Sequence, residues 1–233
     1  MTRAVLRKEL TVLWVSPVPY MAGALFHVVL GLLYVDQLAG RRQAVIQPLF
    51  PIAGFLLLLL VPLIAMRTMA EEIRSGTLDL LYVAHTRTAP LLIGKWLAVW
   101  LTSLVVIAPA TLFVALLGWF GHPDLGPVLS GFSGVALMAA GLAAVGVLAS
   151  SLNESQPVAA GLAAFVGVLL WFARGGPDVV GTGGLLAYLS LSERLRAFAA
   201  GVIDTGDIGF YVTAVAGALV VAALVTDGRR VAR

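Results

Sequence analysis

The sequence contains no cysteine, which excludes disulfide bonds, thiolate metal sites and a cysteine nucleophile. Charge is also scarce. Of the 233 residues, 12% are charged and 60% are hydrophobic, whereas about 25% of the residues in an ordinary soluble domain are charged. This composition predicts that lipid, rather than water, surrounds most of the chain.

Motifs for catalysis and cofactor binding are also missing. There is no G-x-x-x-x-G-K-[ST] phosphate loop and no H-E-x-x-H zinc motif. The three histidines, His27, His85 and His122, fall in separate segments and cannot readily converge on one metal. We therefore expect no cofactor, metal or catalytic residue in this chain. The net charge of +3 comes from basic residues that lie between apolar runs, so we expect no nucleic-acid partner.

Long apolar runs dominate the chain. A membrane-spanning helix needs about 20 mostly apolar residues, and six stretches qualify. They cover residues 19–35, 48–66, 96–119, 127–152, 156–173 and 208–226. All Asp, Glu, Lys and Arg residues fall outside these stretches or at their edges, as the cost of an ionised group in hydrocarbon requires. The sequence thus predicts an all-α integral membrane protein with six spans and a single domain over residues 1–233.

The basic residues between the spans predict the orientation in the membrane. With the N-terminus inside, the inner segments hold ten Lys and Arg residues and the outer segments hold five. Because cytoplasmic segments carry the excess of Lys and Arg, both termini are predicted to be cytoplasmic. Arginine far outnumbers lysine, a composition typical of high-GC bacteria, so a bacterial cytoplasmic membrane is the expected location.

Residues 1–16 have the pattern of an amphipathic helix that lies in the membrane interface. At helical spacing, one face carries Val5, Leu6, Leu10, Leu13 and Trp14. The other face carries Arg3, Arg7, Lys8 and Thr11. Pro17 and Pro19 then end the helix and let the chain turn into the bilayer.

Charges gather in residues 67–95, directly after the second apolar run. If the second span continues as a helix past Met66, Arg67 reaches the lipid headgroups. Glu71 and Arg74 then lie three residues apart and pair along the helix surface. This inner loop is one of two long connections, and long loops often carry function.

Two interpretations of this inner loop remain open. Gly76 is predicted to end the first short helix, and Thr77 to cap a second one that contains Asp79 near its start. The loop is either a solvated linker or a docking surface for a soluble partner. Leu80 and Leu81 beside the charges favour docking, because protein interfaces mix apolar and polar groups.

The second long connection, residues 174–207, contains a local helix pattern on the outer side. Ser190 and Glu193 have capping-box spacing, and Gly201 is placed to end the helix. Leu191, Leu195, Phe198 and Ala199 share one face, with Glu193, Arg194 and Arg196 elsewhere. The pattern predicts an amphipathic helix at the outer interface, placed to close or line an exit.

His27 lies inside the first predicted span. It is either a proton relay or substrate contact, or a neutral imidazole satisfied by a neighbouring helix. A single histidine without a carboxylate partner makes a poor relay, so the second interpretation is favoured.

Several strings together resemble the membrane subunit of ABC-2 type transporters, closest to the gliding-motility-type permeases. They are "LVPLIAMRTMAEEIRSGTLDLL" with "GKW", "RKEL", "SPVPY", "GLAAVGVLASSLNESQPVAA" and "SERLRAFAAGVIDTGD", and they extend over most of the chain. The sequence departs from the family pattern where Pro90 is displaced after the charged loop, and where Gly206 replaces a common arginine before Asp207.

The resemblance implies a six-span permease of the ABC-2 (type V) exporter kind. It works as a dimer, homodimeric or heterodimeric, and engages a separate cytosolic ATPase that binds ATP-Mg. It implies that residues 1–16, with Arg3, Arg7 and Lys8, form an elbow helix. It also implies that the coupling region contains Arg67, Glu71, Glu72, Arg74, Gly76 and Thr77. Within the outer helix, Glu193, Arg194 and Phe198 are the candidate gate residues.

These features give one leading hypothesis and two alternatives. The leading hypothesis is the permease subunit of an ATP-driven exporter. One alternative is a non-transporting membrane anchor or assembly factor that recruits a cytosolic protein. An intramembrane enzyme ranks last, because the spans contain no paired acidic or polar groups at mid-membrane. The sequence does not identify a substrate.

Overall fold

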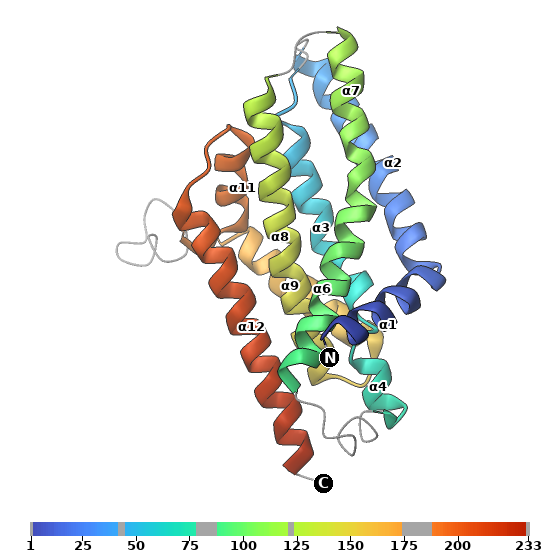
Figure 1. Ribbon diagram of the computed structural model, residues 1–233. Helices are drawn as coiled ribbons and strands as arrows, with labels where there is room; N and C mark the ends of the chain where they lie inside the picture. Colours follow the sequence, from blue (N-terminus) through green and yellow to red (C-terminus); the bar gives the residue numbers. More distant parts are fainter. Residues whose placement is uncertain (1, 42–44, 78–87, 121–123, 174–187, 232–233) are drawn as a thin grey trace.

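A computed structural model describes residues 2–41, 45–77, 88–120, 124–173 and 188–231. Within these residues every regular element is a helix (Figure 1). The helices are α1 (Thr2–Val15), α2 (Val18–Arg41), α3 (Leu49–Ala65), α4 (Ala70–Arg74), α6 (Thr88–Ile107), the 3-10 helix η1 (Ala108–Ala110), α7 (Thr111–Phe120), α8 (Leu125–Leu152), α9 (Gln156–Trp171), α11 (Leu191–Ala199) and α12 (Thr205–Val231). The all-α prediction is confirmed for the described part of the chain.

Five helical segments of the described residues are long and apolar enough to cross a membrane. They are Val18–Ala39, Leu49–Arg74, Thr88–Trp119, Leu125–Leu152 and Thr205–Arg229. The remaining predicted span, residues 156–173, forms α9, which has 16 residues and is about 24 Å long at 1.5 Å per residue. That is shorter than the ~30 Å hydrocarbon core. Six spans therefore stay a prediction that depends on α9.

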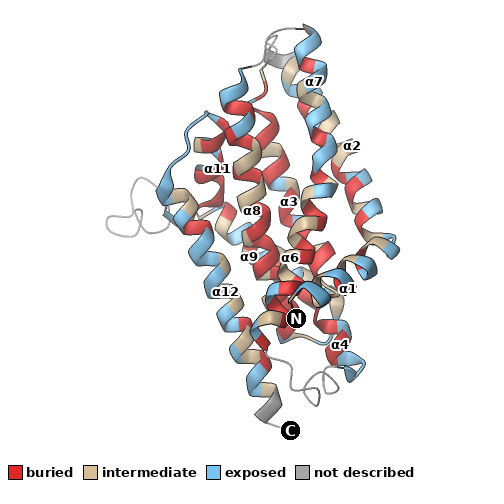
Figure 2. Cartoon of the chain, viewed as in Figure 1, coloured by how far each residue is buried: buried red, intermediate tan, exposed pale blue. Residues whose placement is uncertain are grey.

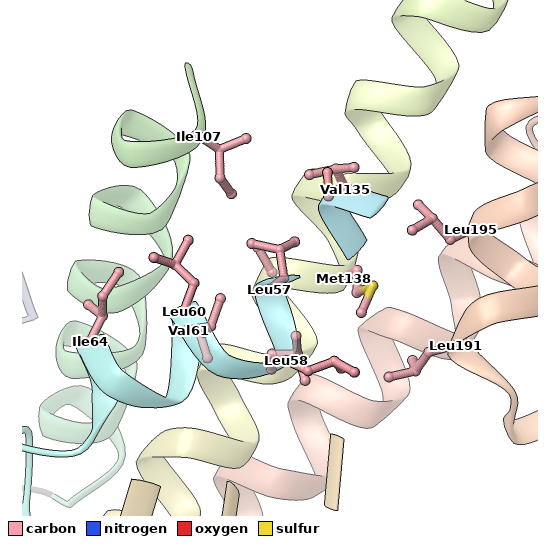
Figure 3. Close-up of a cluster of buried hydrophobic side chains, with 14 of the residues drawn as sticks. Leu57, Leu58, Leu60, Val61, Ile64, Ile107, Val135, Met138, Leu191 and Leu195 are labelled. Carbon is pink, nitrogen blue, oxygen red and sulfur yellow. The ribbon is translucent and has the colours of Figure 1, made fainter. Parts of the chain in front are cut away.

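The helices α3 and α8 form the centre of the bundle, where buried residues are concentrated (Figure 2). Figure 3 shows Leu57 of α3 near Val135 and Met138 of α8. The two helices approach closely because α8 is rich in small residues. A Cβ at Gly146 would lie only 2.5 Å from the Cβ of Ala65. Small residues at such crossings are typical of helix packing in membranes.

The helices α2 and α12 lie at the edge of the bundle and expose large apolar side chains (Figure 2). Leu32 on α2 and Val220 and Leu224 on α12 are among the exposed residues. In water this surface would be unfavourable, whereas in a bilayer it faces hydrocarbon. The exposure pattern therefore agrees with a multi-pass membrane protein.

Both ends of the described chain lie toward the same end of the bundle, together with α1 and α4 (Figure 1). The tip of α7 marks the opposite end. A turn at Pro17 separates α1 from α2, as predicted, and α1 packs against α6. The shared end is consistent with termini on one side of the membrane. Which side that is stays a prediction.

The helix α11 differs from the predicted interfacial helix. Its ends are as expected: the Ser190 hydroxyl accepts from the N–H of Glu193, and Gly201 adopts φ +91°. However, α11 packs into the bundle against α8 and α3, with Phe198 fully buried. The apolar face that suggested contact with lipid instead contacts other helices, because the space beside Gly134 of α8 accepts the ring of Phe198.

Candidate functional site

A fully buried lysine lies where α1, α4 and α6 meet. Lys95 is 0% exposed. Its ammonium donates to the carboxylate of Glu9 over 2.8 Å and to the backbone carbonyl of Thr68 over 2.6 Å, and lies 2.9 Å from Oε2 of Glu72. The first two contacts are hydrogen bonds and the third is an ion pair, because Oε2 of Glu72 has no hydrogen-bond partner among the described residues. The assignment of Lys95 to the inner loop was wrong, because α6 already begins at Thr88.

The two carboxylates come from helices far apart in the sequence. Glu9 on α1 and Glu72 on α4 are both buried. A second lysine, Lys8, donates to Oε1 of Glu72 over 2.8 Å and lies 3.6 Å from Glu9. Together Lys8, Glu9, Glu72 and Lys95 form what we term the Lys95 cluster. Two positive and two negative side chains balance, which offsets much of the cost of burying them.

Lys8 differs from Lys95 in exposure and forms the outer edge of this cluster. Its side chain is 58% exposed. Partial burial alone would lower the pKa of Lys8. The hydrogen bond and charge of Glu72, with the charge of Glu9, outweigh that effect and raise the pKa above its usual value. Lys8 therefore stays protonated wherever the protein is folded at neutral pH.

One hydroxyl of α8 holds the start of α4. The Ser150 Oγ accepts from the N–H groups of Met69 and Ala70, each over 2.9 Å, and donates to the carbonyl of Met66 over 3.1 Å. The first N–H groups of a helix lack partners within it, so Ser150 caps α4 from a neighbouring helix. The condition that the second span continues as a helix past Met66 is not met, because a turn separates α3 from α4.

The face of α4 that lies opposite Glu72 points outward. The Glu71 side chain is 51% exposed and pairs with Arg67 over 3.2 Å. Arg67 also donates to the Ser16 hydroxyl, and Gln156 at the start of α9 donates to Glu71. The predicted pairing of Glu71 with Arg74 was wrong: among the described residues no ion pair joins them. Arg67 is occupied by protein partners rather than extended toward headgroups.

A polar hollow of about 470 Å³ lies beside this outward face. It is lined by Arg74, by Glu154 and Ser155 of the turn between α8 and α9, and by Gln156 and Pro157 at the start of α9. We term Glu71, Arg74, Glu154 and Gln156 the α4 face. This face carries charges of both signs together with hydrogen-bonding groups, and Glu72, on the other side of α4, belongs to the buried Lys95 cluster.

The chain turns sharply after α4 at Gly76, which has φ +70°. Glycine adopts this left-handed conformation without the steric penalty that other residues have, so the prediction that Gly76 ends the helix is confirmed. The Thr77 hydroxyl contacts the Ser75 hydroxyl over 2.9 Å and the Glu72 carbonyl over 3.4 Å. The predicted second helix, which contains Asp79, lies outside the described residues.

The predicted elbow residues separate into two groups. Arg3 and Arg7 are exposed, whereas Lys8 reaches inward to Glu72. The helix packs tightly on α6, since a Cβ at Gly94 would lie 2.9 Å from the Val5 side chain. The predicted coupling residue Glu72 also faces inward, so it is not available to a partner as the sequence suggested.

A second buried ion pair lies at the other end of the bundle, between Arg194 of α11 and Asp207 of α12. The guanidinium also donates to the Tyr188 carbonyl, and its central carbon lies 4.3 Å and 4.0 Å from the ring centroids of Tyr188 and Phe210. The placement of Arg194 away from the buried face was wrong. Asp207 pairs with Arg194, although the neighbouring position, where the family pattern has an arginine, is occupied by Gly206.

The other candidate gate residues have different surroundings. Phe198 is fully buried against α8, while Glu193 is exposed and pairs with Arg196 over 3.3 Å. Within the first span, the Nδ1 of His27 lies 2.8 Å from the carbonyl of Gly23. A contact within its own helix agrees with a locally satisfied imidazole, although Nε2 is buried without a partner in the described part of the chain.

A comparison with protein families now bears on these features. A family model described as ABC-2 family transporter protein matches residues 32–177. The chain belongs to this family. The match includes α3, α4, Lys95 and Ser150, so the site on α4 lies within the region that defines the family. A multi-pass permease component of an ABC transporter is thereby supported, while the gliding-motility subfamily stays a prediction. A search of curated proteins found no match.

Sequence reasoning missed Lys95, Glu9 and Ser150 as members of the site. Lys95 interrupts the otherwise apolar string "LLIGKWLAVW", and a charge within such a helix is a signal that it has a partner. Its partner Glu9 is 86 residues away, so local spacing does not reveal the pair. Ser150 resembles many other small polar residues of α8 and gives no separate signal.

Proposed function

We propose that this permease is the membrane-spanning subunit of an exporter powered by a separate cytosolic ATPase that binds ATP-Mg. The observation that carries the proposal is the two-sided character of α4. One side is exposed and charged, while the other is fixed to the Lys95 cluster and to Ser150. A short helix of this kind is suited to receive force from a soluble partner.

The α4 face is the proposed docking surface. Glu71 and Arg74 supply opposite charges, and the hollow beside them offers further polar contacts from the turn between α8 and α9. Exposed charges chiefly determine register and association rate, whereas anchoring requires apolar contacts near them. This role replaces the docking role that the sequence suggested for Glu72.

The Lys95 cluster is the proposed connection between docking and the spans. Glu72 moves with α4, Lys95 belongs to the third span, and Glu9 belongs to α1. Ser150 adds the fourth span, because its hydroxyl holds the first N–H groups of α4. Displacement of α4 therefore displaces three neighbouring helices as one body, in the manner of rigid-body coupling.

The remaining parts of the proposal concern the surroundings of the chain. The protein works as a dimer of permease chains in a bacterial cytoplasmic membrane, with α4 and both termini in the cytoplasm. The helix α11 closes the outer end of the path. Its buried contacts with α3 and α8, and the ion pair of Arg194 with Asp207, support a closed position there.

The test begins with a tagged full-length chain purified in detergent from membranes of the source bacterium. Three forms are compared: wild type, Glu71→Arg/Arg74→Glu, and the control Glu193→Arg/Arg196→Glu. Both double variants exchange charges three residues apart without altering net charge. An ATP-hydrolysing protein should co-purify with wild type and the control, and be lost from the α4 variant. A folded wild-type chain that retains no nucleotide-binding protein would refute the proposal and favour an anchor.

A further inference from the structure

An apolar groove of about 580 Å³ runs between α6, α8 and α12, away from the site on α4. One wall consists of Leu92, Trp96 and Trp100 of α6, and the facing wall includes Ala216 and Val220 of α12. The groove lies along helices that are long and apolar enough to span the bilayer. Neither the Lys95 cluster nor the α4 face contributes to it.

The aromatic wall of the groove is fixed in place. The rings of Trp96 and Trp100 stack with centroids 5.5 Å apart and planes 9° from parallel. Each indole N–H donates to a backbone carbonyl of α8, that of Ala140 and that of Ala136 respectively, over 2.9 Å. Both polar atoms are therefore occupied within the protein. The Tyr211 hydroxyl is also buried, so the wall is lined by carbon.

The groove cannot be closed simply by moving α12 toward α6. Toward one end of α12, Asp207 pairs with Arg194. Toward the other end, Asp227 accepts from the Thr88 hydroxyl over 2.5 Å. These polar contacts hold both ends of the helix, while small side chains such as Ala216 leave the space between its middle and the indoles unfilled. The groove therefore results from the polar contacts that fix the two ends of α12.

The shape of the groove favours a single extended hydrocarbon chain. Its lining on α12 runs from Tyr211 to Ala223, about 18 Å at 1.5 Å per residue. The volume of about 580 Å³ leaves room along this length for a long apolar ligand. Methylene carbons contact their neighbours at about 3.5–4.0 Å, so an extended hydrocarbon chain can contact the walls along the groove. A polar ligand would leave its polar groups without partners against this lining.

We propose that the groove binds one acyl chain of a membrane phospholipid. Ile93, Val212 and Val220 are exposed at its rim, so a chain can enter sideways from the hydrocarbon layer. Apolar burial provides the attraction, and the stacked indoles give the chain a flat surface to contact. The headgroup remains in the interface and contributes no selectivity. This inference does not depend on ATP-driven transport.

The test uses the full-length chain in detergent and native mass spectrometry with added dioleoyl phosphatidylcholine. Ala216→Phe fills the groove, whereas Ala214→Phe places the same ring on an exposed part of α12 that does not line it. Wild type and Ala214→Phe should each retain one lipid per chain. Ala216→Phe should bind about tenfold more weakly, because a ring in the groove displaces methylene contacts.

Competition on the wild-type chain provides a measurement that does not depend on any variant folding. Oleate should displace the lipid, and glycerophosphocholine, which has the headgroup but no acyl chain, should not. Equal lipid binding by the two phenylalanine variants would overturn the proposal. Displacement of the lipid by glycerophosphocholine would also overturn it. A third contradicting result would be a wild-type dimer that retains no lipid and that dissociates into monomers when Ala216→Phe is introduced, because a second copy of the chain would then occupy the groove.

Discussion

Glu71 and Glu72 are adjacent, yet their carboxylates serve opposite sides of α4. The Glu71 side chain is 51% exposed and pairs with Arg67, whereas the Glu72 side chain is 11% exposed and pairs with Lys95. Adjacent helical residues differ by about 100° in direction, so this division follows from the helix itself. In the proposed function, Glu71 belongs to the docking surface and Glu72 to the connection with the spans.

The first prediction concerns the charge on Lys95. Lys95→Met leaves Glu9 and Glu72 buried without their central counter-charge, and is expected to lower the free energy of unfolding by about 3–5 kcal/mol. Lys8→Met removes a lysine whose side chain is 58% exposed and should cost less than about 1 kcal/mol. Thermal unfolding in detergent measures both. Equal losses would show that the Lys95 cluster is not a buried unit.

The second prediction concerns the cap on α4. Ser150→Ala removes the acceptor of two backbone N–H groups and should cost about 1–3 kcal/mol. Ser151 is equally buried, but its hydroxyl donates only within α8, to the Leu148 carbonyl. Ser151→Ala should therefore cost less than about 1 kcal/mol. The melting temperatures of the two variants measure these losses of stability. A larger loss for Ser151→Ala than for Ser150→Ala would contradict the capping role of Ser150.

The third prediction tests the turn after α4. Among the described residues, no atom lies within 4 Å of a Cβ at Gly76, so we expect the φ of +70° to dominate the effect of Gly76→Ala. It should destabilise the protein by about 1–2 kcal/mol. Gly217→Ala, which also meets no atom within 4 Å but lies inside α12, should cause no loss. If thermal unfolding ranks the two in the reverse order, the left-handed turn is not required.

The fourth prediction concerns the opposite end of the bundle. Arg194→Lys retains the positive charge but loses the planar guanidinium that lies between Tyr188 and Phe210. Because lysine does not reproduce this stacking, we expect a loss of about 1–2 kcal/mol in the free energy of unfolding. Arg196→Lys, at an exposed pair with Glu193, should be nearly neutral. If Arg194→Lys leaves the free energy of unfolding unchanged, the positive charge alone accounts for the stabilisation at this position.

The elements that the sequence predicted correctly depend on short-range patterns. These elements are the turn at Pro17, the cap at Ser190 and the helix ends at Gly76 and Gly201, and each depends on a few neighbouring residues. A helix also precedes Pro17, while its position in the membrane interface stays a prediction. Hydrophobic length likewise located most of the spans. Such features require no knowledge of which helices meet.

The elements that were missed depend on long-range packing. Glu9 and Lys95 are 86 residues apart, and nothing in either local pattern specifies the other. Similarly, α11 has the composition of an interfacial helix, but its apolar face is buried because Gly134 of α8 leaves room for Phe198. Amphipathicity determines which face is apolar. It does not determine whether lipid or protein covers that face.

The most direct test of the central claim is photo-crosslinking from α4 in the purified complex with its ATPase. Because the chain has no cysteine, Arg74→Cys provides a single attachment point for benzophenone maleimide, which reacts with C–H bonds of any neighbour. Arg196→Cys, on α11 toward the other end of the bundle, is the matched control. We predict a crosslink to the ATPase from position 74 and none from position 196. A complex that contains the ATPase but gives no crosslink from position 74, or equal crosslinks from both positions, would contradict the account.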